Sequence, residues 1–119
     1  MDIVVTVPMP LWQEWLAEGD LPGQPWSGHA SHFWIPRAPL PEIAPGERVY
    51  IVAHGHLRGY APLVELEPTC RIRPDRACLL RTGEAVALTT PEPIRGFRGW
   101  QYRWWAHNYE RPFPGWREP

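Results

Sequence analysis

The hydrophobic residues of this chain occur in short runs with the two-residue period of a β-strand, and prolines or glycines separate these runs. A β-branched run at residues 3–7 (IVVTV) predicts a first strand. Residues 48–53 (RVYIVA) and 58–67 (RGYAPLVELE), joined by a His-Gly-His turn, predict a β-hairpin. Pro62 cannot donate a backbone hydrogen bond to a neighbouring strand, so we expect a sheet edge or a bulge at that position.

Shorter patterns predict the rest of the fold. Further strands are expected at residues 32–35, 69–73 and 84–90. Apolar residues at helical spacing predict an amphipathic helix over residues 10–18, with Trp12 and Trp15 in the core, and Asp75 could cap a second small helix over residues 76–82. The whole pattern indicates a mainly β (α+β) fold: one domain, residues 1–119, built as a small barrel or strongly bent sheet of five to seven short strands with two short helices.

The most unusual stretch is residues 94–105 (IRGFRGWQYRWW), where three arginines, three tryptophans, a tyrosine and a phenylalanine share twelve positions. On a strand the side chains alternate between two faces, one with Trp100, Tyr102 and Trp104 and the other with Gln101, Arg103 and Trp105. One aromatic row can pack in the core. The other face is too polar for a core and too aromatic for an ordinary solvent-exposed face, so we expect a functional surface here.

Arginine and aromatic side chains together suit a nucleic-acid ligand, because guanidinium groups contact phosphates and aromatic rings stack on bases. The candidate ligand-binding residues come from this stretch, from the hairpin and its turn, and from the loop over residues 21–32; they are Arg58, Tyr60, Arg95, Arg98, Trp100, Tyr102, Arg103, Trp105, His54, His56 and Trp26. The structural alternative is that half of the aromatic side chains fill the barrel and the arginines cover their edges.

Charge and composition narrow the possible functions. The net charge of −1 hides an asymmetry: residues 1–47 carry six acidic residues and one arginine, whereas residues 48–119 carry eleven arginines and seven acidic residues. A basic C-terminal half permits an anionic partner. All twelve basic residues are arginine, so Schiff-base chemistry and a lysine nucleophile or general base are excluded.

Cysteine usage and hydropathy bear on the compartment. The hydrophobic segments are shorter than a membrane span and no signal-peptide pattern opens the chain, so we expect a cytoplasmic protein with no membrane partner. In that setting the two cysteines, Cys70 and Cys78, are expected to be free thiols.

Metal and catalytic sites have weaker signals. A zinc site would be possible if the 21–32 loop folded over the hairpin turn and brought together His29, His32, His54 and His56. The spacings HxH and HxxH are common by chance, and we expect no metal or other cofactor. A histidine could also act as an acid–base partner of Glu65, Glu67 or Glu84. Carboxylates that alternate with valine and leucine on a strand usually face solvent, however.

Two stretches resemble the PUA-like domains, a superfamily that includes the ASCH and EVE groups. Residues 47–67 (ERVYIVAHGHLRGYAPLVELE) resemble their β-hairpin, and residues 79–105 (LLRTGEAVALTTPEPIRGFRGWQYRWW) resemble their later helix–strand–strand unit. The resemblance implies a pseudo-barrel that binds RNA or a modified nucleobase in a cleft beside the sheet, and some ASCH members are hydrolases. Their acetylcytidine amidohydrolase pattern requires a lysine, which this chain lacks, so Thr89, Thr90 and Glu84 are not carried over as catalytic residues.

The favoured hypothesis is therefore a binding module that recognises RNA or a modified nucleobase through an Arg- and Trp-lined cleft. One alternative is a small ASCH-type hydrolase or nuclease with a non-lysine site, such as His54 or His56 with a carboxylate; another is a protein-interaction domain with exposed aromatic side chains. A histidine and a carboxylate in hydrogen-bond contact in the cleft would favour the enzyme. Affinity that falls steeply with salt would favour nucleic acid over a protein partner.

Overall fold

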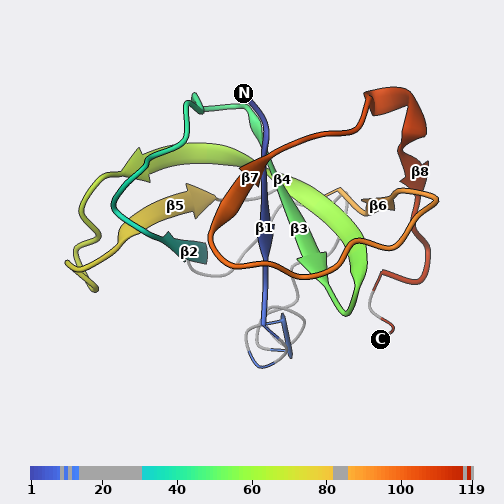
Figure 1. Cartoon of the computed structure of the whole chain (residues 1–119), viewed down its shortest axis with the longest axis horizontal. Coiled ribbons are helices and arrows are strands. Elements are labelled where there is room, and N and C mark those ends of the chain that lie inside the picture. Colours follow the sequence, from blue (N-terminus) through green and yellow to red (C-terminus); the bar gives the residue numbers. More distant parts are fainter. Residues whose placement is uncertain (9, 11, 14–30, 82–85, 117, 119) are drawn as a thin grey trace.

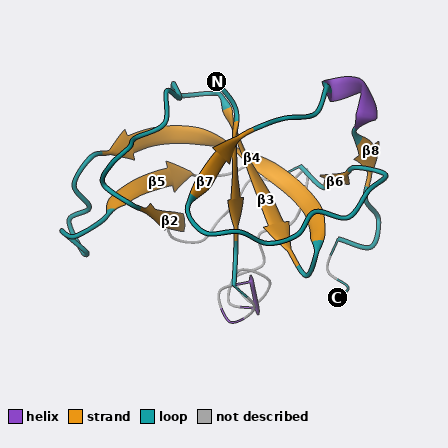
Figure 2. Ribbon diagram, in the orientation of Figure 1, coloured by secondary structure: helices purple, strands orange, loops and turns teal. Residues whose placement is uncertain are grey.

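A computed structural model describes residues 1–8, 10, 12–13, 31–81, 86–116 and 118, with the side chains of residues 31 and 32 left out. The protein is mainly β, as the sequence predicts (Figure 1). Its strands are β1 (Ile3–Thr6), β2 (Ser31–Ile35), β3 (Arg48–Ala53), β4 (His56–Glu67), β5 (Ala77–Arg81), β6 (Leu88–Thr89), β7 (Trp100–Tyr102) and β8 (Arg111–Pro112). A single-turn 3-10 helix, η1 (His107–Tyr109), precedes β8 (Figure 2).

Six strands form one mixed sheet in the order β2-β5-β4-β3-β1-β7, and β6 pairs with β8 separately. The predicted hairpin is confirmed as β3 and β4. The long strand β4 curves so strongly that its first half pairs with β3 and its second half with β5, which gives a half-barrel (Figure 1). Pro62 is the last β4 residue paired with β3, and a register shift follows between Leu63 and Glu65. The predicted bulge is thus found beside Pro62, whereas the predicted edge is wrong because β4 lies inside the sheet.

Both faces of the sheet are buried around β1 and β3. Odd-numbered residues of β1, such as Ile3 and Val5, point into a larger core on one face, which also contains Trp12 and residues of β2, β4 and β5. On the other face Val4 joins Tyr50 in a smaller core that is completed by Leu57, Leu88 and Ile94. Because each strand face has a partner layer, the apolar residues of β3 form a continuous run rather than an alternating one.

Three predicted elements differ from the structure. Residues 77–81 form strand β5 rather than a helix, because Ala77 and Leu79 point into the larger core and the segment pairs on both sides. Residues 69–73 form a turn and not a strand, and the strand predicted at 84–90 is confined to β6 within the described residues. Pro10, Trp12 and Gln13 have helical backbone conformation, but most of the predicted 10–18 helix lies outside the described residues. No helix in the described parts of the chain is both long and apolar enough to cross a bilayer.

The prediction of free thiols is wrong for this structure. Cys70 and Cys78 form a disulfide, with their Cα atoms 5.1 Å apart. The bond closes the loop between β4 and β5, and both cysteines are fully buried. The sequence does not indicate this pairing, because two cysteines eight residues apart are compatible with either redox state.

Candidate functional site

An aromatic groove lies on the side of the sheet that carries the smaller core. It has a volume of about 760 Å³. One wall is the chain from Thr90 to Phe97, and the other wall and floor come from four side chains between residues 101 and 109. The lining residues are Thr90, Pro91, Glu92, Pro93, Ile94, Arg95, Gly96, Phe97, Gln101, Trp104, Trp105 and Tyr109. This volume is within the range of pockets that hold small organic ligands.

Hydrogen bonds attach both walls of the groove to the sheet. In the first wall, the Ile94 N–H donates to the Gly55 carbonyl at 2.9 Å, and the Phe97 N–H donates to the Thr6 hydroxyl at 3.1 Å. The second wall begins where the Arg103 N–H donates to the Asp2 carbonyl at 3.1 Å. Segments that the sequence places far from β1 and from the β3–β4 turn are therefore fixed against them.

Five polar side chains that line the groove have no polar partner within the described part of the chain. They are Glu92, Arg95, Gln101, Trp104 and Tyr109. Trp104 and Tyr109 are each 55 % exposed, unusual for large aromatic residues. The Trp104 ring packs T-shaped with Phe97 and Trp105, at centroid distances of 6.3 and 5.0 Å, and keeps more than half of its surface exposed. The groove therefore offers aromatic surface, an amide, a guanidinium and a carboxylate to a ligand.

A buried carboxylate, that of Glu110, fixes the Trp105 ring in the groove wall. The Trp105 indole N–H donates to Glu110 Oε2 at 2.9 Å, and the Tyr50 hydroxyl donates to the same oxygen at 2.6 Å. Arg48 Nη1 donates to Glu110 Oε1 at 3.2 Å, and the Glu110 side chain is only 9 % exposed. Burial and the hydrogen bond to Glu110 raise the pKa of Tyr50, so its hydroxyl remains a donor. Trp105 is thus held by its ring nitrogen.

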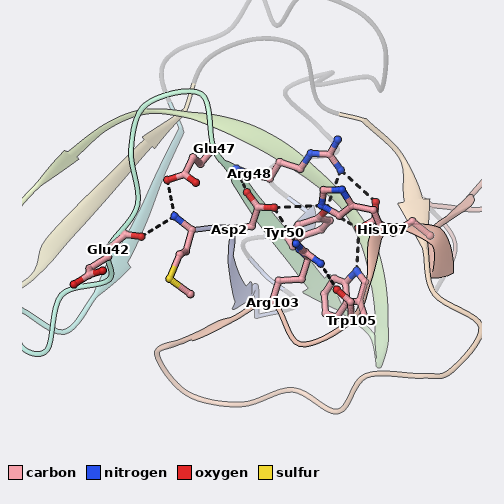
Figure 3. Close-up of polar contacts among 10 residues, drawn as sticks. Asp2, Glu42, Glu47, Arg48, Tyr50, Arg103, Trp105 and His107 are labelled. Atoms are coloured by element: carbon pink, nitrogen blue, oxygen red, sulfur yellow. Dashed lines mark hydrogen bonds and ion pairs between the residues drawn. The ribbon is translucent and has the colours of Figure 1, made fainter.

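A second carboxylate, that of Asp2, holds the same segment through its main chain (Figure 3). Arg103 Nε donates to Asp2 Oδ2 at 3.3 Å, and Arg103 Nη1 donates to the Trp105 carbonyl. His107 Nε2 lies 3.4 Å from Asp2 Oδ2, and the Arg48 backbone N–H donates to Asp2 Oδ1 at 2.9 Å. Burial alone would raise the pKa of Asp2, but these hydrogen bonds outweigh it and the pKa is lowered. Trp105 is therefore fixed at both ends, whereas the Trp104 side chain makes no hydrogen bond with the residues that the structure describes.

We expect Glu110→Gln to loosen the Trp105 ring and to lower the free energy of unfolding by about 1–3 kcal/mol, because one amide oxygen cannot satisfy donors on both sides. Near-UV circular dichroism and urea unfolding would measure the two effects. Glu92→Gln is the matched control: Glu92 is exposed and its carboxylate has no hydrogen bond or ion pair in the described part of the chain, so a change within about 0.5 kcal/mol is expected. Equal effects of the two substitutions would contradict the role of Glu110 in holding the Trp105 ring.

The structure brings only some of the predicted ligand-binding residues to the groove. Arg95 and Trp105 line it, and Arg98 is exposed directly after the last residue of the first wall. Arg103 lies behind the second wall, where it forms the ion pair with Asp2. Trp105 lies beyond the end of β7 at Tyr102 and packs against the smaller core beneath the groove.

Two predicted residues of β7 lie on the opposite face of the sheet. Trp100 and Tyr102 pack against the larger core, with their ring centroids 4.8 Å apart. The Trp100 indole N–H donates to the Pro39 carbonyl at 3.1 Å, and the Tyr102 hydroxyl accepts from the Glu42 N–H at 3.0 Å. The sequence placed both among the candidate ligand-binding residues and left open which face of the strand is buried; in the structure both rings pack against a core.

The remaining candidates are distributed away from the groove. Arg58 is 2 % exposed and donates to main-chain carbonyls, and Tyr60 lies beneath the guanidinium of Arg48, 4.2 Å from its Cζ. His54 and His56 lie in the β3–β4 turn, where neither forms a hydrogen bond to a carboxylate in the part of the chain that the structure describes. Trp26 lies outside the described residues. Within those residues no three His, Cys, Asp or Glu side chains gather as a metal site, and the side chains of His29 and His32 are not among them.

Sequence reasoning missed the residues that organise the groove from below. Glu110 is a single acidic residue in a proline-rich stretch, and its donors come from β3 and from residue 105, so no local pattern points to it. Tyr109 and Gln101 were also absent from the candidate ligand-binding residues, although Gln101 belongs to the strand face that the sequence indicates as functional. Trp104, by contrast, belongs to the Arg/aromatic stretch that the sequence marked as the functional surface.

Comparison with known proteins identifies one protein family. A protein-family model described as "Protein of unknown function (DUF1489)" matches residues 13–106, more than half of the chain. Searches of the curated proteins and of the solved structures each found no match. The matched residues include most of the groove lining, from Thr90 to Trp105, and stop before Tyr109 and Glu110.

Proposed function

This chain belongs to the DUF1489 family of proteins of unknown function, and we propose from the geometry of the aromatic groove that it is a nucleic-acid-binding module. In this proposal the groove holds an unpaired or modified nucleobase of RNA. The observation that carries the proposal is that four of the five groove side chains with unused polar groups in the described residues suit a nucleotide; they are Arg95, Gln101, Trp104 and Tyr109.

Each of these side chains matches one part of a nucleotide. The exposed rings of Trp104 and Tyr109 are suited to stacking on a base, which contributes about 1–3 kcal/mol per base in single-strand-binding proteins. The Gln101 amide has both donors and an acceptor, as the polar edge of a base requires. Arg95 is exposed at the same groove and supplies a cation for a phosphate.

The architecture supports a relation to PUA-like domains, which we propose as the origin of this fold. A strongly curved β4 and a cleft beside the sheet are what the resemblance of residues 47–67 and 79–105 implies. The region resembling a helix–strand–strand unit contains β5 rather than a helix at residues 77–81, so the correspondence is closest at the hairpin. The proposed nucleic-acid-binding function rests on the groove and not on this relation, because one fold can carry many functions.

Two other functions were considered from the sequence. A hydrolase would need a histidine and a carboxylate in contact at the groove, and the one such pair among the described residues, His107 with Asp2, does not line it. A protein partner would use the exposed rings of Trp104 and Tyr109 as anchors. Salt separates this possibility from nucleic acid, because only phosphate contacts make the affinity fall steeply as salt rises.

The sequence favours a cytoplasmic location, which is part of the proposal. One feature of the structure favours a different compartment. The disulfide between Cys70 and Cys78 is of a kind more typical of oxidising compartments. An RNA ligand favours the cytoplasm, whereas the disulfide favours an oxidising compartment. The redox state of these two cysteines in the cell decides between the two locations.

We expect Trp104→Ala to weaken binding of single-stranded RNA by about 1–3 kcal/mol, roughly 5-fold to 150-fold, because one stacking surface is removed. Fluorescence anisotropy of labelled oligonucleotides, at low and moderate salt, measures the loss. Trp34→Ala is the matched control, since Trp34 is also exposed, at 44 %, but lies on β2, away from the groove. An affinity that Trp104→Ala leaves unchanged would contradict the proposal. So would binding of neither RNA nor DNA by the unsubstituted protein.

A further inference from the structure

The two walls of the aromatic groove are joined at both of their ends. At one end the chain continues from Phe97 through β7 to Trp104, so that the first wall leads directly into the second. At the other end β6 pairs with β8, and the register places Thr89 opposite Arg111. Figure 1 shows the two segments leaving β7 and meeting again at β6 and β8. The main chain therefore joins the two walls at each end of the groove, which makes it a basin rather than a channel that a strand could follow.

A basin of this kind restricts how a polymer can bind. A base can enter it from the open side, but the sugar-phosphate backbone on either side of that base must cross the rim. Each phosphate in the strand carries a negative charge, so the rim positions where the backbone crosses should carry cations. The prediction for the structure is an exposed cation at each end of the basin.

Exposed arginines are found at both ends. Arg98 follows the last residue of the first wall, is exposed, and makes no hydrogen bond or ion pair within the described residues. Arg111 lies at the β6–β8 end and is also exposed. Its Nη1 donates to the Asn108 carbonyl at 2.9 Å and to the Glu110 carbonyl at 3.2 Å, which fixes the guanidinium, and its other donors have no partner among the described residues. Arg95 supplies a third cation from within the wall.

We infer that the ligand is one unpaired nucleotide inside a single strand, with its base in the basin and its flanking phosphates at Arg98 and Arg111. This inference rests on the proposed function and narrows it. A free nucleoside would fill the basin but leave both rim arginines without a partner. A regular duplex would present the phosphates but keep its bases paired and outside the basin.

The test compares ligands of two lengths at several salt concentrations. The probes are the nucleoside monophosphates of adenine, cytosine, guanine and uracil and the matching ribo-homotrinucleotides, with affinities measured by isothermal titration calorimetry. The proteins are the unsubstituted chain, Arg98→Gln, Arg111→Gln and the double variant. Arg71→Gln is the charge-matched control, because Arg71 lies in the β4–β5 loop at the opposite end of the molecule (Figure 1).

We expect trinucleotides to bind more tightly than the monophosphates. Each rim substitution should lower the trinucleotide affinity and make the slope of log K against log salt shallower by about 0.7, the value for one phosphate contact in a single strand. Monophosphate affinity should not change, and Arg71→Gln should match the unsubstituted protein. Equal binding of both ligand lengths, with no effect of Arg98 or Arg111, would overturn this inference and leave the proposed function standing. Binding of neither ligand would overturn both.

Discussion

Gly59→Ala is expected to lower the free energy of unfolding by at least about 4 kcal/mol, a very large effect for one methyl group. A Cβ at this position would lie 2.2 Å from the Val86 carbonyl oxygen, a main-chain atom that cannot rotate away. That same oxygen accepts the Tyr60 N–H at 3.0 Å, so the clash breaks the bridge between Tyr60 and Val86. The backbone adds strain, since Gly59 has a φ of +152°, which L-residues rarely adopt.

Urea unfolding followed by tryptophan fluorescence measures the loss. Gly46→Ala is the matched control, because Gly46 also has a positive φ, +89°, but has no atom within 4 Å of the added Cβ. Backbone strain alone should cost about 1–2 kcal/mol there. The difference between the two variants isolates the close approach of Val86 to β4. A Gly59→Ala variant that is no less stable than Gly46→Ala would show that this approach is not a fixed part of the fold.

Arg58→Ala is expected to lower the free energy of unfolding by about 3–5 kcal/mol, because several hydrogen bonds to a buried cation are lost together. Arg58 Nε donates to the Ala53 carbonyl at 2.8 Å, and Nη1 donates to the carbonyls of Trp116 and Glu118. The guanidinium also lies over Phe113, with Cζ 5.3 Å from the ring centroid. Burial lowers the pKa of this arginine, and no described carboxylate compensates for it.

The expected structural consequence is release of the C-terminal segment. Hydrogen exchange and limited proteolysis should show faster exchange and cleavage near Trp116, in addition to the lower stability in urea. Arg37→Ala is the control, since Arg37 is exposed and makes no hydrogen bond or ion pair with the described residues, and a change within about 0.5 kcal/mol is expected. An Arg58→Ala variant with unchanged stability and weakened RNA binding would restore Arg58 to the phosphate contacts predicted from the sequence.

The fold could be predicted where local pattern and long-range pairing agree. The β3–β4 hairpin is specified by two β-rich runs around a His-Gly-His turn, so it was found. The sequence predicts a helix at the segment 77–81 (ACLLR), because Asp75 before it and Gly83 after it are typical of helix boundaries. A five-residue apolar run has no period that separates a buried strand from a helix, and only the pairing of β5 with β2 and β4 decides it.

The sequence identifies the segment that forms the site, but it does not predict how the side chains of that segment are arranged. The density of arginine and tryptophan in residues 94–105 marked the right part of the chain. Strand β7 ends at Tyr102. The alternation of faces, which would place Trp104 on the same face as Trp100, therefore does not continue to Trp104. Trp100 lies against the larger core while Trp104 lines the groove. Glu110 could not be found at all, because its role arises from contacts with distant residues.

The position of β1 has a consequence for how the protein is made. This strand lies between β3, to which it is parallel, and β7, which is antiparallel, and it is made before both of them. During translation Ile3–Thr6 can find neither neighbour until residues 48–53 have been synthesised, and the second neighbour only after residue 102. Its three valine and isoleucine side chains have no neighbouring strand in the nascent chain until β3 has been made. The half-barrel must therefore assemble late, with an apolar β-forming segment awaiting its partners, which is the situation in which nascent chains recruit chaperones.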